Sequence, residues 1–184
     1  MNSYSHMPIR AAFAAVSVAI GALAFAATPA DIDAGVAGTL NRFYSQDQTH
    51  RDLTQKAAAV LVFPQVTKAG AGVGGEYGEG ALQVDGKTVG YYKMTGASVG
   101  ATLGAARRSE VILFMTDAAR DKFMHSHDWS IGADTGVAVV HKGAGAQYDT
   151  QTARKPVLAF VFGEKGLIAD ASLEGAKVTR LPQQ

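Results

Sequence analysis

The 184-residue chain contains no cysteine. Disulfide bonds, cysteine-ligated metals and lipid attachment through cysteine are therefore excluded. The fold must be stabilised by its hydrophobic core alone, and a chain of this length can bury such a core in one domain.

The chain also lacks an excess of charge of either sign. It has 17 Lys and Arg against 16 Asp and Glu. Binding to nucleic acid depends on a strong local excess of Lys and Arg that neutralises phosphates. Nucleic acid is consequently not an expected partner, and an anionic lipid would have to be met by a local cluster of cations.

Residues 11–30 carry no charged side chain and follow Arg10. This pattern is typical of an export signal, and Ala24-Phe25-Ala26 offers the small residues that signal peptidase requires. We predict a signal peptide over residues 1–26, cleaved after Ala26, with Ala30 as the second choice. The protein would then lie in the periplasm or be secreted, at the periphery of a membrane. An uncleaved anchor helix is the alternative, since the stretch is long enough to cross a bilayer.

Residues 27–55 are predicted to form an N-terminal helical segment. Its apolar residues recur at helical spacing, and Asp31 and Asp33 stand where the helix dipole favours negative charge. A second helix is expected after a break at residues 46–48, capped by Thr49 or Asp52. It would run into a strand near residues 60–63. The apolar positions of the first helix are Ile32, Val36, Leu40, Phe43 and Tyr44.

Glycine dominates the middle of the chain, with eleven of the 21 glycines between Gly70 and Gly104. Pro64 is expected to end the preceding strand, and from there the pattern has period two. Glycines fall on one face of residues 70–80 and again on one face of residues 96–104. Strands with such bare faces let another element approach closely, or bend where a sheet curls. Asp85-Gly86 predicts a two-residue hairpin turn.

Further elements follow towards the C-terminus. Strands are predicted at residues 111–115, 129–140, 157–162 and 167–173, the last two joined by a turn at residues 164–166, with a final strand near 178–181. Thr116 is expected to cap a short helix. The helices lie mostly at the N-terminus and do not alternate with strands. The predicted fold class is thus α+β, with a curved, mostly antiparallel glycine-rich sheet or barrel-like sandwich, N-terminal amphipathic helices and one short helix between strands.

Several motifs stand in a defined order along residues 56–182. They are Ala59-Val60-Leu61-Val62-Phe63-Pro64, Lys68-Ala69-Gly70, Gly72-Val73-Gly74-Gly75 and Ala171-Ser172-Leu173-Glu174-Gly175. In these motifs the chain resembles the SYLF domain family, whose eukaryotic members bind phosphoinositide membranes and actin. The resemblance implies a non-catalytic lipid-binding domain over residues 56–182. Because the chain is predicted to be exported, actin is not an expected partner. The partner that the resemblance implies is membrane phospholipid.

Two glycine motifs could suggest catalysis. Residues 70–75 fit the dinucleotide fingerprint G-x-G-x-x-G, but Glu76 and Glu79 follow where a phosphate-binding helix should begin. Residues 96–100 fit the nucleophile motif G-x-S-x-G around Ser98, with Asp134 and His141 later in the chain. Alternation continues through Ser98, which indicates a strand rather than the required turn. No catalytic residue and no cofactor is expected, although a serine hydrolase using Ser98 stays an alternative.

His125 and His127 could ligate a metal together with Asp128, but no spaced fourth ligand accompanies them. No metal site is predicted. A third reading is a structural envelope protein that binds another protein through its glycine-bare strands.

The predicted lipid contacts combine apolar and basic side chains. The first helix would lie on the membrane with Leu40, Phe43 and Tyr44 facing it, while basic residues approach the head groups. Lys68 stands where SYLF sequences commonly have lysine, at the mouth of the glycine-lined segment. The basic residues are Arg42, Lys56, Lys68, Arg107 and Arg108.

Overall fold

The computed structural model describes residues 27–131, 136–141, 154–166 and 175–182. Two very long strands dominate it, β1 (Ala59–Val84) and β2 (Lys87–Phe114), which pair antiparallel along their length. They meet at Asp85 and Gly86, whose φ angles of 50° and 74° are those of a type I′ turn. The predicted hairpin turn is confirmed.

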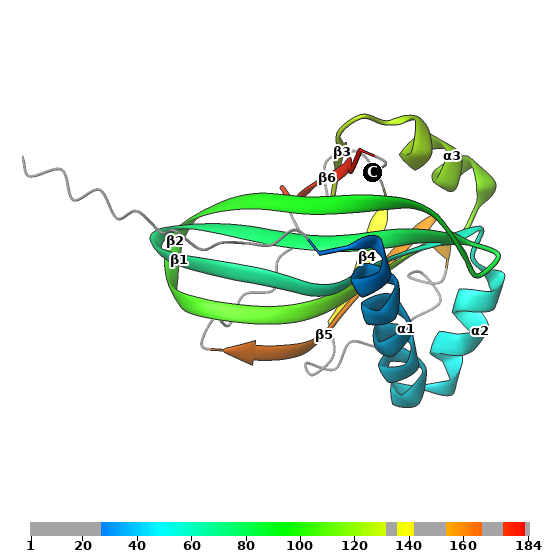
Figure 1. The fold of residues 1–184 in the computed structure, drawn as a ribbon, viewed down its shortest axis with the longest axis horizontal. Helices are drawn as coiled ribbons and strands as arrows, with labels where there is room; N and C mark the ends of the chain where they lie inside the picture. The colour runs from blue at the N-terminus through cyan, green and yellow to red at the C-terminus, as the bar shows by residue number, and fades with distance from the viewer. Residues whose placement is uncertain (1–26, 132–135, 142–153, 167–174, 183–184) are drawn as a thin grey trace, which may run out of the picture.

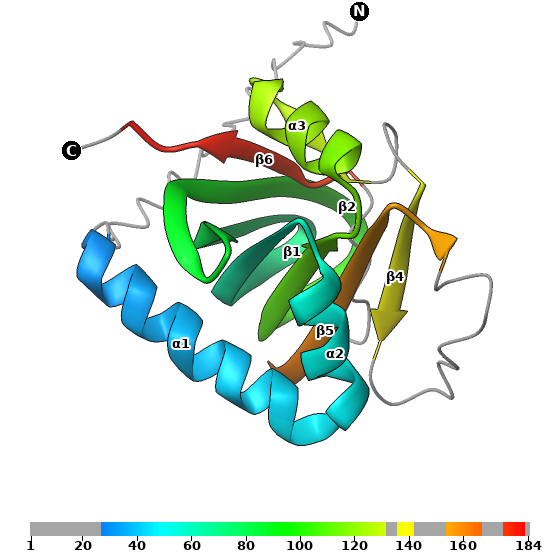
Figure 2. The same cartoon turned by 90° about the vertical axis from the view of Figure 1, so that its right-hand side faces the viewer.

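The remaining described strands extend this hairpin into a six-stranded sheet of order β3-β6-β2-β5-β4, with β1 on β2. They are β3 (Trp129–Ser130), β4 (Val137–His141), β5 (Val157–Gly166) and β6 (Lys177–Arg180). All described pairs are antiparallel except β4 with β5. The sheet curls into a half-barrel (Figure 2), which confirms the predicted α+β class with a curved, mostly antiparallel sheet.

Glycine permits the curl. Each long strand folds back at its middle (Figure 1), so that the second half of β1 passes close to its first half. A Cβ atom built on Gly80 would lie 2.1 Å from the Val62 carbonyl oxygen, and one on Gly78 would lie 2.8 Å from Val66 Cγ2. Such distances leave no room for a side chain, so the predicted close approach at the bare glycine face is confirmed for these two positions.

Three helices flank the described sheet. Helix α1 (Pro29–Gln46) begins with a capping box of Thr28 and Asp31, and α2 (Gln48–Lys56) follows after Asp47. Both lie on the outer face of the curl (Figure 2), where α1 contacts β1. Helix α3 (Asp117–His125), capped by Thr116 as predicted, lies on the opposite side near β6.

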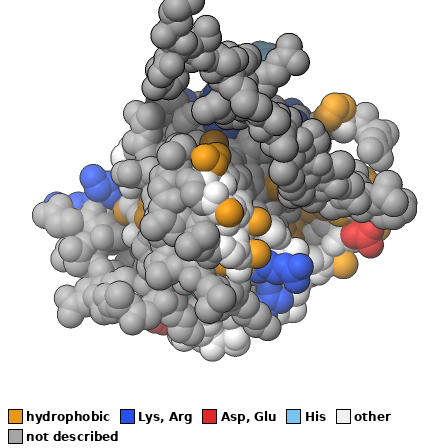
Figure 3. Space-filling model, turned by 90° about the vertical axis from the view of Figure 1, so that its left-hand side faces the viewer, with side chains coloured by type: hydrophobic (Ala, Val, Ile, Leu, Met, Phe, Trp, Pro, Cys, Tyr) orange, Lys and Arg blue, Asp and Glu red, His pale blue; other side chains and the backbone are white. Residues whose placement is uncertain are grey.

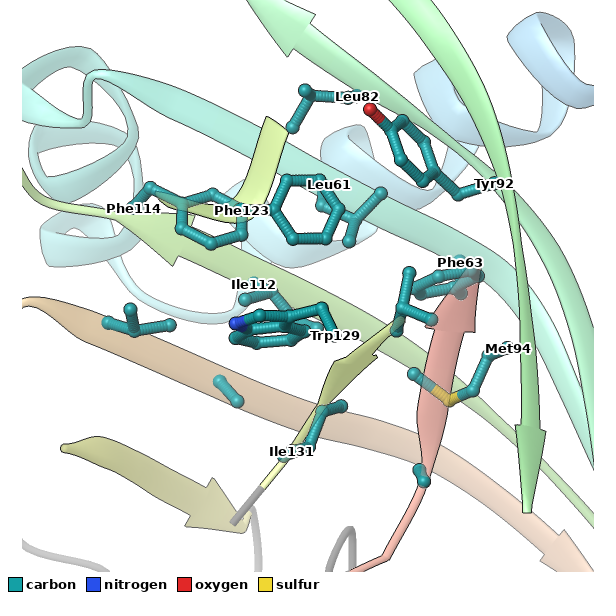
Figure 4. Close-up of a cluster of buried hydrophobic side chains, with 14 of the residues drawn as sticks. Leu61, Phe63, Leu82, Tyr92, Met94, Ile112, Phe114, Phe123, Trp129 and Ile131 are labelled. Carbon is teal, nitrogen blue, oxygen red and sulfur yellow. The ribbon is translucent and has the colours of Figure 1, made fainter. Parts of the chain in front are cut away.

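The core has two parts. One lies inside the curl, where α3 and β3 contribute Phe123 and Trp129 to a cluster that includes Leu61, Phe63 and Met94 (Figure 4). The other lies between the sheet and the two N-terminal helices. The inner and outer faces of the same strands therefore both contact apolar side chains.

Four sequence predictions are wrong in detail. Pro64 does not end the first strand, because β1 passes through it at a bulge between Phe63 and Val66. Asp47, whose side chain accepts from the Thr49 amide, caps α2 in place of Thr49 or Asp52. Residues 164–166 belong to β5 rather than to a turn. The strand predicted at 129–140 is two strands, β3 and β4, and the one at 167–173 lies outside the described residues.

Candidate functional site

Leu40 and Phe43 do not face outward. Leu40 is buried, and Phe43 is fully buried against the sheet. The ring of Phe43 stacks on His50 with 4.0 Å between centroids and contacts Phe160 and Phe162 of β5. The orientation predicted for these two residues is wrong, because the apolar stripe of α1 covers the outer face of the sheet and belongs to the core.

The polar neighbours on the two helices also serve to attach them. The Arg42 guanidinium donates to Thr39 Oγ1 and to Ser109 Oγ of β2, at 3.0 and 3.2 Å. Arg51 stands over the ring of half-buried Tyr44, 4.6 Å from its centroid. Lys56 is exposed in the last turn of α2, at the end of the molecule that carries the helices (Figure 1). Arg42 and Lys56 are exposed and Tyr44 is half-buried, so the lipid contacts predicted for these three residues stay predictions.

A cluster of buried charges lies on the face of the sheet that lines the curl. Arg108 is only 5% exposed, and its guanidinium binds Glu76 Oε2 at 2.7 Å and Glu110 Oε1 at 2.6 Å. Lys68, on the neighbouring part of β1, is buried as well. The burial of Lys68 and Arg108 does not agree with the predicted approach of these two side chains to lipid head groups.

One arginine in this cluster faces two carboxylates. Glu110 is fully buried, and its second oxygen, Oε2, has no hydrogen-bond partner among the described residues. Burial raises the pKa of Glu110 to about 7, against the attraction of Arg108. Glu76 lies opposite Gly96 in the ladder, where a Cβ atom would approach its Oε1 to 2.6 Å. Glycine at position 96 thus makes room for the carboxylate.

The middle of the long hairpin carries no charge, and several of its described side chains are exposed. We call it the glycine bend and define it as residues 69–75 of β1 and 95–106 of β2, which contain no charged residue. It lies at the end of the molecule remote from the helices (Figure 1). Val73 is 67% exposed there, the largest exposure among the described large hydrophobic residues. Among the residues of the bend whose side chains the structure describes, Ala69, Ala71, Gly75, Ala97, Gly104 and Ala105 are also exposed.

Cations border the glycine bend. Arg107 is exposed immediately after it, and Lys93 precedes it on β2. Lys177 of β6 is exposed and pairs with Thr95 in the ladder. Figure 3, which looks at this end, shows hydrophobic side chains with Lys and Arg side chains beside them. The acidic residue next to the bend in sequence, Glu76, is already paired with Arg108.

The motifs that could suggest other chemistry have unsuitable surroundings. Ser98 lies inside β2, opposite Gly74, whereas a nucleophile elbow needs a turn from strand to helix. Residues 70–75 lie inside β1 and open no helix. The Nδ1 of His125 contacts the Asp121 carbonyl oxygen, and His127 is exposed. Within the described part of the chain, no group of three or more His, Asp or Glu side chains could hold a metal.

Among the described residues, no helix combines the length and apolar character required to cross a bilayer. Asp134 lies outside the described residues.

Comparison with known proteins gives one family. No curated protein matches the chain. Residues 95–183 match the family model described as Ysc84, Las17-binding protein actin regulator. The match begins at the β2 part of the glycine bend and continues through α3, β5 and β6. This match over residues 95–183 agrees with the resemblance to the SYLF, or Ysc84, family that the sequence motifs predict.

Proposed function

We propose that this protein is a non-catalytic module that binds phospholipid membrane surfaces through its glycine bend, after export to the periplasm or the cell exterior. The family supports a binding role, since its model describes a binding protein and actin regulator. The uncharged residues 11–30 support export. Membrane phospholipid is the partner that an exported member of this family would meet.

The observation that carries the proposal is the exposed, uncharged surface around Val73 with cations at its border. Full burial of a valine side chain yields about 1.5–3 kcal/mol. About two thirds of the surface of Val73 is exposed, so its burial in a membrane would yield about 1–2 kcal/mol. A cation such as Arg107 close to an anionic surface adds about 1 kcal/mol. Together they support weak, reversible adsorption that depends on both terms.

The small side chains of the bend suit such a contact. Alanine and glycine let the strand backbones approach the interface, while the ladder between β1 and β2 satisfies backbone hydrogen bonds along the bend. Positions 69–71 pair with 103–105, and 73–75 pair with 97–99. The bend can therefore contact head groups without exposing a long unpaired edge between these two strands.

Co-sedimentation with liposomes tests the proposal. The parent should sediment with vesicles, and more strongly when they contain anionic phospholipid. Val73→Asp should reduce binding about 5- to 30-fold on every lipid, from the loss of about 1–2 kcal/mol. Val139→Asp is the matched control, because Val139 of β4 is also exposed but lies outside the bend.

The basic border is tested separately. Arg107→Glu should weaken binding on anionic vesicles at low salt and have little effect on zwitterionic ones. The vesicles contain no protein, so a module that binds only another protein would not sediment with them. A folded Val73→Asp variant that sediments like the parent would contradict the assignment of the glycine bend.

A further inference from the structure

The residue next to the predicted leader has a defined contact. The backbone nitrogen of Ala27 donates to Glu79 Oε2 of β1 at 3.0 Å, although the two residues are 52 positions apart. The other oxygen of the same carboxylate, Oε1, accepts from the Tyr77 hydroxyl. Burial and the hydrogen bond to Glu79 raise the pKa of Tyr77 to about 12, so the phenol stays a donor at neutral pH. Glu79 thus receives Tyr77 on one oxygen and Ala27 on the other.

Helix α1 begins immediately after this contact. Thr28 Oγ1 accepts from the Asp31 amide at 3.2 Å, and Asp31 Oδ2 accepts from the Thr28 amide at 3.2 Å. This reciprocal capping box stabilises the first turn, which starts at Pro29. Ala27 is consequently the last residue before the cap.

The two predicted cleavage positions have different consequences for this structure. Cleavage after Ala30 would remove Thr28 and Pro29 and leave an ammonium in the first turn, where the helix dipole disfavours positive charge. Cleavage after Ala26 keeps the whole capping box. It also turns the Ala27 amide, which already donates to Glu79, into a charged donor.

We propose that the chain is processed between Ala26 and Ala27 and that Glu79 is the docking site of the new N-terminal ammonium. Hydrolysis adds one water across this peptide bond, with Ala26 leaving as a carboxylate and Ala27 keeping the amine, which takes up a proton. The inference rests on the export that we propose above. It adds a binding site for the mature N-terminus, which ties the start of α1 to β1.

The charges around Ala27 support an ammonium there. Asp31 of α1 and Glu79 of β1 line the same hollow beside Ala27, together with Tyr77. Lys93 of β2 lies opposite Glu79 in the ladder. The ammonium would therefore share the Glu79 carboxylate with Lys93. Two carboxylates and one lysine thus surround the position, which favours the protonated amine.

The full-length chain, expressed with its leader in a bacterial host and purified from the exported fraction, provides the test. Intact mass and N-terminal sequencing should give Ala27 as the first residue. The pKa of its amine, followed by NMR after ¹³C reductive methylation, should exceed the ordinary range of about 7.7–8.0. In Glu79→Gln it should fall by about half a unit or more, and in Asp85→Asn, which alters an exposed carboxylate of the hairpin turn, it should not change.

The possible outcomes separate this inference from the proposed function. A product that begins at Met1 would overturn both the docking site and export. A product that begins at Asp31 would leave export intact and overturn the docking site. A product that begins at Ala27 with the same amine pKa in the parent and in folded Glu79→Gln would also leave export intact and overturn the docking site. Lipid binding is measured on vesicles and is independent of these results.

Discussion

Replacement of the buried carboxyl group at position 110 should change how stability depends on pH. The pKa of Glu110 is raised from 4.5 to about 7, chiefly by burial. Between these two values the folded state holds a proton that the unfolded state has released. The free energy of unfolding of the parent should therefore fall as pH rises from about 4.5 to about 7, and this contribution should be flat above pH 7.

The size of the effect follows from the same two values. A rise from 4.5 to about 7 corresponds to about 3 kcal/mol. Glu110→Gln keeps the shape of the side chain and a hydrogen-bond acceptor for Arg108 but cannot ionise. The variant should match the parent near pH 5 and be more stable than it by up to about 3 kcal/mol at pH 8.

Urea denaturation of the parent and Glu110→Gln at pH 5, 6, 7 and 8 measures this difference directly. Asp85→Asn serves as the control, since Asp85 is exposed in the hairpin turn and should leave the pH dependence unchanged. If the difference in unfolding free energy between parent and Glu110→Gln is the same at pH 5 and pH 8, the pKa of Glu110 is not raised in the folded state.

The other predictions concern packing. Gly80→Ala should lower the unfolding free energy by at least about 1–3 kcal/mol, because its Cβ would meet the Val62 carbonyl. Gly38→Ala in α1, where nothing lies within 4 Å, should raise it by about 0.5–1 kcal/mol. Thermal melts of both variants measure these changes, and equal melting temperatures would exclude the close approach at Gly80. Phe43→Ala should lower the unfolding free energy by about 3–5 kcal/mol, as expected of a core ring; a change below about 0.5 kcal/mol in urea denaturation would mean that α1 does not pack on the sheet.

The fold class could be predicted because its signals are local. Asp85-Gly86 specifies its turn through backbone conformation alone, and Thr116 caps α3 as its position suggests. The glycine alternation correctly indicated close approach at Gly78 and Gly80. Pro64 was misleading because a β-bulge accommodates a residue without an amide hydrogen, and bulges leave no clear mark in a single sequence.

The positions of the candidate site residues could not be predicted in the same way. A helical stripe such as that of α1 has the same pattern whether it faces a membrane or a sheet, and only the tertiary contacts of Phe43 decide between them. The buried charges did have a signal. Every second position of this part of β2 is occupied in turn by Arg108, Glu110, Ile112 and Phe114. The four residues therefore share the face that lines the curl.

If the glycine bend contacts the membrane as proposed, the absence of cysteine allows this contact to be measured directly. A single cysteine introduced as Val73→Cys can carry an environment-sensitive fluorophore, and Val139→Cys provides the control at another exposed valine. On addition of anionic vesicles, the label at position 73 should shift to the blue and be quenched by lipids that carry a quencher in their acyl chains, while the label at position 139 should do neither. Equal spectra at position 73 with and without vesicles to which the protein is bound would contradict the account.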